Sequence, residues 1–150
     1  MAITYPTLLG QPAPQLSAYN RETAVAEKFE AMVKLGQLNS RMKDFFDVWL
    51  LSRQGTFRAE SLGEAIARTF ERRGTPLTLD PVCFAELFFA STAKAVQWQA
   101  FVRRGHFTDP VPAFSEVVGE VARFLRPVCA ALITGQKGTS VWQPGGPWLP

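Results

Sequence analysis

The stretch that decides the fold reads NRETAVAEKFEAMVKLGQLNSRMKDFFDVWLL and spans residues 20–51. Its first part carries apolar residues at the spacing of a single helix face, namely Val25, Phe29, Met32 and Val33. Asn20 is a favourable N-cap residue and Gly36 is a favourable stop. We therefore expect a first amphipathic helix between these two residues.

A second helix is predicted over about residues 41–53, with Ser40 as its N-cap. Its apolar side chains cover most of the helix circumference, which is typical of a central, buried helix. These side chains are Met42, Phe45, Phe46, Val48, Trp49, Leu50 and Leu51. Because only residues 36–39 join the two helices, we expect them to form an antiparallel hairpin.

Further helices are predicted outside this hairpin. Ser61 and Glu64 form a capping-box pattern, and Asp80 followed by proline is a favourable helix start. Pro127 should kink or split the last helix. The predicted ranges are 62–73, 81–90, 92–104 and 113–134.

The two ends of the chain differ from this helical body. Residues 3–9 are expected to form a short extended segment, and residues 136–150 a loosely ordered tail. Trp142 and Trp148 should dock on the body; otherwise the tail frays. The predicted fold is mainly α, a single domain over 1–150, with an irregular bundle of about five to six helices behind a short N-terminal β-strand.

The composition excludes several classes of protein. Of the 150 residues, 47% are hydrophobic and 19% are charged, with a mild net charge of +3, so the chain should be globular. The N-terminus does not resemble a signal peptide, and no apolar run is long enough to span a membrane. Cys83 and Cys129 are expected to be buried free thiols, which favours a cytoplasmic protein. The single histidine, His106, makes a zinc site or a Ser-His-Asp triad improbable on residue types alone.

Three charged residues stand out because they interrupt apolar surfaces. Lys28 lies at the boundary of the first apolar stripe, where its stem can cover apolar surface while its ammonium points into a cleft. Asp44 and Asp47 project from one side of the second helix and need cationic or hydrogen-bonding partners. The nearest candidates are Lys28, Arg41 and Lys43. The same residues also fit two structural readings, an ordinary exposed lysine and an ion pair that orients two helices.

Residues 20–33 and 39–51 together resemble the signature of the AbiEii/AbiGii toxin family. The similar features are a Glu-Thr helix with an Ala-Glu-Lys core, a short turn, and an Arg-x-Lys-Asp-Phe-x-Asp run. Residues 5–9 and 144–148 also look similar to family sequences. Members are nucleotidyltransferases of bacterial toxin–antitoxin and phage-defence systems.

The resemblance implies a polymerase-β-like enzyme that transfers a nucleotide from an NTP, in studied relatives onto the 3′ end of tRNA. It assigns Lys28 to the nucleotide phosphates. Asp47, together with Asp44, would support the catalytic centre. Arg41 and Lys43 would stabilise either the phosphates or the acids. Nucleotidyl transfer depends on positioning and on neutralising phosphate charge, so these residue types suit these roles.

The chain departs from the family pattern in one decisive respect. Such enzymes carry a Gly-Ser motif followed by Asp-x-Asp, whose carboxylates hold magnesium, and neither occurs in these 150 residues. We therefore expect a truncated product, an excised piece or one part of a split enzyme, inactive alone and with no cofactor of its own. Mg²⁺ and NTP are expected only with the missing N-terminal domain, and the expected partners are an antitoxin protein and a tRNA acceptor.

Two alternatives remain open at this stage. The helical body could instead be a non-catalytic module that binds protein or RNA, or a remnant without a present role. Arg72-Arg73 and Arg103-Arg104 could contact an RNA backbone, but they also suit solvated helix ends.

Overall fold

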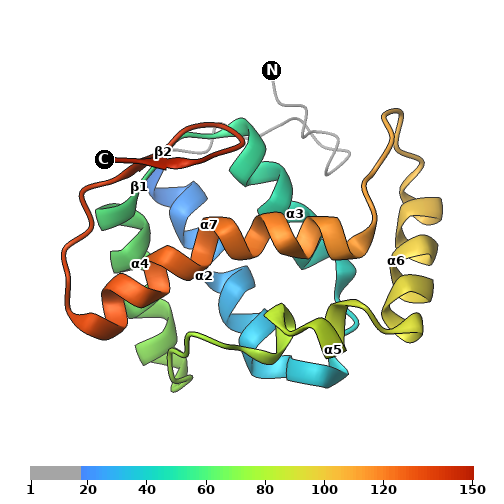
Figure 1. Cartoon of the computed structure of the whole chain (residues 1–150), viewed down its shortest axis with the longest axis horizontal. Helices are drawn as coiled ribbons and strands as arrows, with labels where there is room; N and C mark the ends of the chain where they lie inside the picture. The colour runs from blue at the N-terminus through green and yellow to red at the C-terminus, as the bar shows by residue number, and fades with distance from the viewer. Residues whose placement is uncertain (1–17) are drawn as a thin grey trace.

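The computed structural model describes residues 18–150, with side chains from Arg21 onward. The strand predicted over residues 3–9 lies outside the described residues. Within the described part, the fold is mainly α, as predicted (Figure 1). The helical elements are α2 (Ala18–Leu35), η1 (Gly36–Leu38), α3 (Met42–Gln54), α4 (Ala59–Arg73), η2 (Val82–Phe84), α5 (Glu86–Phe89), α6 (Thr92–Gly105) and α7 (Phe114–Thr134).

The helix α7 crosses the middle of the molecule, with α4 on one side of it and α6 on the other (Figure 1). It packs against α3 and α4, while α2 packs against both α4 and α3. Aromatic rings fill the space between these helices. Phe45 lies 5.1 Å from Phe114 between ring centroids, and Phe29 lies 5.3 Å from Phe70. The α2–α3 hairpin therefore rests on a continuous core that fixes its position.

Three helices begin at residues other than the predicted ones. Helix α2 already includes Ala18, so Asn20 lies inside it and is not its N-cap. Arg41, and not Ser40, occupies the N-cap position of α3, without a side-chain capping bond. Helix α4 begins at Ala59, which places Ser61 within its first turn.

The segment after Pro81 is broken where a continuous helix was predicted over 81–90. Ala85 is extended, with φ −85° and ψ 142°, and separates η2 from α5. By contrast, α7 is continuous through Pro127 and is not split by it. Among residues 18–150, no helix combines the length and the apolarity that a membrane crossing requires.

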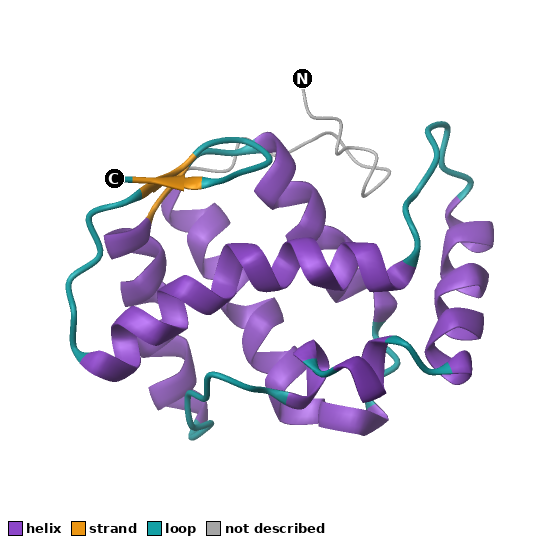
Figure 2. Cartoon of the chain, in the orientation of Figure 1, coloured by secondary structure: helices purple, strands orange, loops and turns teal. Residues whose placement is uncertain are grey.

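A small antiparallel sheet closes one end of the bundle (Figure 2). Its strands are β1 (Phe57–Arg58), β2 (Val141–Trp142) and β3 (Trp148–Leu149), in the order β1-β2-β3. The Trp142 indole is buried and donates to the carbonyl of Ser52 at 2.6 Å, and the Trp148 indole donates to that of Phe124 at 2.9 Å. Both tryptophans thus dock on the helical body, as expected. The strands β2 and β3 that carry them were not predicted from the sequence.

Candidate functional site

Lys28 of α2 faces Asp44 and Asp47 of α3 across the predicted hairpin. Its Nζ lies 3.1 Å from Asp47 Oδ2 and 3.7 Å from Asp44 Oδ1. The short connection through η1 turns the chain back, so that residues on facing sides of the two helices meet. The spatial convergence expected from the sequence is therefore present.

Two further cations reach the same carboxylates from within α3 and its N-cap. Arg41 Nε lies 3.0 Å from Asp44 Oδ2, and Lys43 Nζ donates to Asp47 Oδ2 at 2.8 Å. Residues three and four apart are neighbours on a helix surface, which accounts for both pairs. All five residues singled out in the sequence thus form one cluster, which we call the Lys28 cluster (Lys28, Arg41, Lys43, Asp44 and Asp47).

The two signs of charge in the Lys28 cluster lie at different depths. The side chains of Asp44 and Asp47 are only 5% and 4% exposed. Those of Lys28, Lys43 and Arg41 are 28%, 53% and 61% exposed. The aspartates are buried and the cations lie closer to the protein surface, so an approaching molecule contacts nitrogen atoms first.

The buried carboxylates are incompletely satisfied. Burial raises the pKa of Asp44, and the nearby charges of Lys28 and Arg41 oppose that rise. Although Arg41 Nε is close to Asp44 Oδ2, the contact is not aligned as a hydrogen bond. Asp47 Oδ1 is also buried, without a hydrogen-bond partner among the described residues. Each aspartate therefore has a buried oxygen that accepts no aligned hydrogen bond from the described residues.

These carboxylates do not fit a magnesium site. Mg²⁺ prefers an octahedral shell of oxygen ligands, whereas Lys28, Arg41 and Lys43 already place cationic nitrogen atoms within 4 Å of Asp44 and Asp47. Three positive charges against two negative ones repel a further cation. In the part of the chain that is described, no group of three His, Cys, Asp or Glu side chains is arranged to hold a metal ion.

A buried lysine that the sequence analysis did not single out supports the start of α3. Lys94 Nζ donates to the carbonyl of Asn39 at 2.5 Å and lies 4.9 Å from the centroid of the Phe88 ring. Asn39 Oδ1 in turn accepts from the backbone N–H of Arg41 at 2.8 Å. Burial lowers the pKa of Lys94. The chain from Lys94 through Asn39 fixes the backbone from which Arg41 extends.

A second group of charged residues lies between α2 and the end of α4, apart from the Lys28 cluster. Glu30 is buried and accepts from Arg73 Nη1 at 2.9 Å and from Thr75 Oγ1 at 2.7 Å. Burial pushes the pKa of Glu30 upward most strongly, but the bonds from Thr75 and Arg73 together hold it below its usual value. Arg72 and Arg73 both approach Glu27 at 3.8 Å. Arg73 is thus engaged with α2 through Glu30, while the Arg72 side chain remains 61% exposed, as a solvated helix end would be.

The chain is thus a helical protein in which buried carboxylates hold three partly exposed cations in place. Charged N–H donors of this kind suit anionic oxygens, and phosphate above all. A family model described as Nucleotidyl transferase AbiEii toxin, Type IV TA system matches residues 2–120. The chain belongs to this family, as its sequence resemblance indicated.

The family match contains the whole Lys28 cluster and ends within α7. The similarity noted for residues 144–148 lies beyond it. No curated protein and no solved structure matches the chain. The roles of Lys28, Arg41, Lys43, Asp44 and Asp47 within the family's activity therefore remain predictions for this chain.

Proposed function

We propose that this chain supplies the phosphate-contacting part of a nucleotidyltransferase toxin. The observation that carries the proposal is the arrangement of the Lys28 cluster, in which three partly exposed cations form ion pairs with two buried aspartates. A site that receives a triphosphate needs positive groups that are held in place before the ligand arrives. Membership of the AbiEii family gives this chemistry its class of reaction.

Lys28 is the central contact in this proposal. Its ammonium is fixed by Asp47 and Asp44 from one side while 28% of the side chain stays exposed. A nucleotide phosphate would approach from the exposed side and complete the lysine's coordination. Arg41 and Lys43 widen the positive surface at the start of α3 and would take neighbouring phosphate oxygens.

Asp44 and Asp47 act as positioning residues in this scheme. They are too deeply buried to reach a substrate hydroxyl directly. They instead form ion pairs with the three cations, which restricts the conformations of these long side chains. Asp44 Oδ2, which Arg41 approaches without an aligned hydrogen bond, and Asp47 Oδ1, which accepts no hydrogen bond from the described residues, are the oxygens that a further segment of the complete site would serve.

The metal-holding carboxylates must come from elsewhere. The 150 residues contain neither a Gly-Ser pair nor an Asp-x-Asp triplet, and the aspartates of the Lys28 cluster do not fit Mg²⁺. We therefore expect the chain to be inactive alone and to act as a fragment or subunit. The family's description as a toxin–antitoxin system supports an antitoxin partner. We further propose a cytoplasmic location, a role in phage defence and a tRNA acceptor, which only the sequence resemblance implies.

A transfer assay tests the proposal. The chain is incubated with labelled NTPs, Mg²⁺ and total tRNA, alone and together with a separately produced family domain that carries Gly-Ser and Asp-x-Asp. We expect incorporation only in the mixture, and a loss of at least about tenfold with Lys28→Met. A control variant, Lys137→Met, removes the same charge from an exposed position outside the cluster. Equal incorporation by wild type and Lys28→Met mixtures would contradict the assignment, and incorporation by the chain alone would contradict its fragment status.

A further inference from the structure

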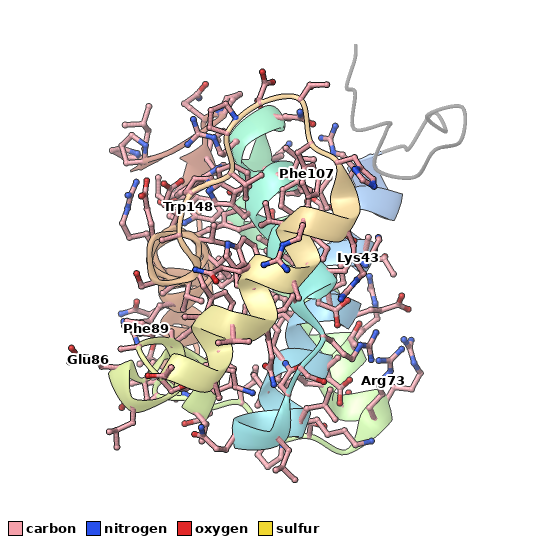
Figure 3. All side chains as sticks on the ribbon, turned by 90° about the vertical axis from the view of Figure 1, so that its right-hand side faces the viewer. Lys43, Arg73, Glu86, Phe89, Phe107 and Trp148 are labelled. Carbon is pink, nitrogen blue, oxygen red and sulfur yellow. The ribbon has the colours of Figure 1, made fainter. Side chains whose placement is uncertain are left out.

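One buried lysine connects α6 to the segment at which the Lys28 cluster begins. Helix α6 packs against both α3 and α5, and Figure 3 shows it between Lys43 of the cluster on one side and Phe89 of α5 on the other. Lys94 of α6 is only 5% exposed. Its Nζ donates to the carbonyl of Asn39 at 2.5 Å and to Gln97 Oε1 at 3.3 Å. Lys94 thus attaches the backbone just before α3 to α6.

The position of Arg41 depends on this attachment. Arg41 occupies the N-cap of α3 without a side-chain capping bond, and its φ of −84° and ψ of 74° lie outside the helical range. Its backbone N–H donates to Asn39 Oδ1 at 2.8 Å, and Asn39 is also the residue whose carbonyl Lys94 contacts. The exposed guanidinium reaches Asp44 only through a contact that is not aligned as a hydrogen bond. Because that contact is a weak restraint, the position of the guanidinium rests on the backbone that carries it.

The contact between Lys94 and Asn39 is unfavourable as a purely stabilising device. Among the residues that the structure describes, no carboxylate lies within ion-pair distance of Lys94, and a buried ammonium without such a partner is destabilising. Asn39 is 1% exposed, and its Nδ2 finds no hydrogen-bond acceptor in the same part of the chain. Apolar side chains hold two helices together without either penalty. Proteins retain such local penalties mainly where function requires a fixed geometry.

We propose that Lys94 is a positioning residue for anion binding at the Lys28 cluster, and that it acts through Asn39 on Arg41. This inference rests on the proposed function, since it concerns how tightly the same cluster binds a chain of phosphates. Lys94 is too deeply buried to contact a ligand itself. Removal of its ammonium frees the Asn39 carbonyl and loosens the turn that carries Arg41. The guanidinium must then be ordered when the phosphate binds, which weakens the affinity.

Titrations of the full chain with inorganic tripolyphosphate, followed by backbone NMR, test the proposal through a double-mutant cycle. Lys94→Met keeps the apolar stem and should raise the dissociation constant about fivefold, as expected when one long side chain must be ordered on binding. In an Arg41→Met background the same change should have an effect of less than about 1.5-fold. Asn39→Ala removes the acceptor of the Arg41 N–H and should reproduce the loss. The urea midpoint of Lys94→Met should stay within about 0.3 M of the wild-type value.

The cycle separates positioning from a loss of charge or of folding. If Lys94 acted only through its charge, or if its loss weakened the whole fold, the effect of Lys94→Met would persist in the Arg41→Met background, and the proposal would be wrong. The matched control Lys137→Met removes the same charge from an exposed position and should change the dissociation constant by less than about 1.5-fold.

The Arg41 side chain provides a readout that does not depend on phosphate. Its Nε–Hε NMR signal should move in Lys94→Met toward the signals of exposed arginines such as Arg104, and should stay in place in Lys137→Met. An unchanged Arg41 signal would overturn the proposal. If Lys28→Met weakens tripolyphosphate binding and Lys94→Met does not, this inference fails and the proposed function stands. If the wild-type chain does not bind tripolyphosphate, the proposed function fails and this inference fails with it.

Discussion

Replacing Lys28 by methionine should destabilise the fold more than the exposure of this lysine suggests. The change removes a cation from two buried carboxylates, and their Oδ atoms lie 3.1 and 3.7 Å from its Nζ. At 3.1 Å and an effective dielectric constant of about 20, the gross attraction to Asp47 is about 5 kcal/mol. Exposed pairs retain less than about 1 kcal/mol of such an attraction, and breaking a fully buried pair costs about 3–5 kcal/mol. Because Lys43 still contacts Asp47, we expect a loss of about 2 kcal/mol.

A double-mutant cycle with Asp47→Asn isolates this interaction. In the Asp47→Asn background the charge nearest to Lys28 is gone and only the longer 3.7 Å contact to Asp44 is left, so Lys28→Met should cost only about 0.5 kcal/mol, which gives a coupling of about 1.5 kcal/mol. Urea denaturation followed by tryptophan fluorescence provides the four free energies of unfolding. If the two changes are additive within about 0.3 kcal/mol, the aspartate does not hold the lysine and the positioning role fails.

Three further predictions concern other parts of the molecule. Glu30→Gln should reduce the free energy of unfolding by about 2 kcal/mol at pH 7. Because the pKa of Glu30 in the folded protein is lowered from 4.5, the stability that this carboxylate contributes should be fully present above about pH 4.5 and be lost as the pH falls through the lower folded pKa. Urea titrations at several pH values should show this loss for the wild type and not for Glu30→Gln. Burial raises the pKa of the Cys83 and Cys129 thiols to about 12, so Ellman's reagent at pH 8 should label neither until urea unfolds the chain; fast labelling of the native protein would contradict their burial. Trp142→Ala should reduce the free energy of unfolding by about 3–5 kcal/mol, since it empties a buried site and removes the bond to Ser52; a change below about 1 kcal/mol would show that the C-terminal hairpin does not dock.

The Lys28 cluster could be predicted from sequence because every step that builds it is local. Helical spacing placed Asp44 and Asp47 on one side of α3, and a connection of a few residues made the hairpin antiparallel. Both inferences need no knowledge of the rest of the fold. The free, buried state of Cys83 and Cys129 was confirmed for a similar reason, since their apolar surroundings are visible in the sequence.

Long-range contacts explain what the sequence did not reveal. Glu30 meets Arg73 across 43 residues and Lys94 meets Asn39 across 55, and no local spacing signals either pair. The start of α4 moved from Ser61 to Ala59 because the backbone N–H of Ala59 donates to the carbonyl of Ser140, next to the β1–β2 pairing. The strands themselves hold two residues each, too few for an alternating pattern.

The central claim is that the Lys28 cluster receives phosphate, and side-chain NMR of the lysine ammonium groups during a titration with inorganic tripolyphosphate tests it most directly. The account predicts that the signals of Lys28 and Lys43 shift together, with a dissociation constant of about 1 mM that increases with salt and rises about tenfold in Lys28→Met but not in Lys137→Met. Shifts of Lys137 alone, or identical binding by wild type and Lys28→Met, would contradict it.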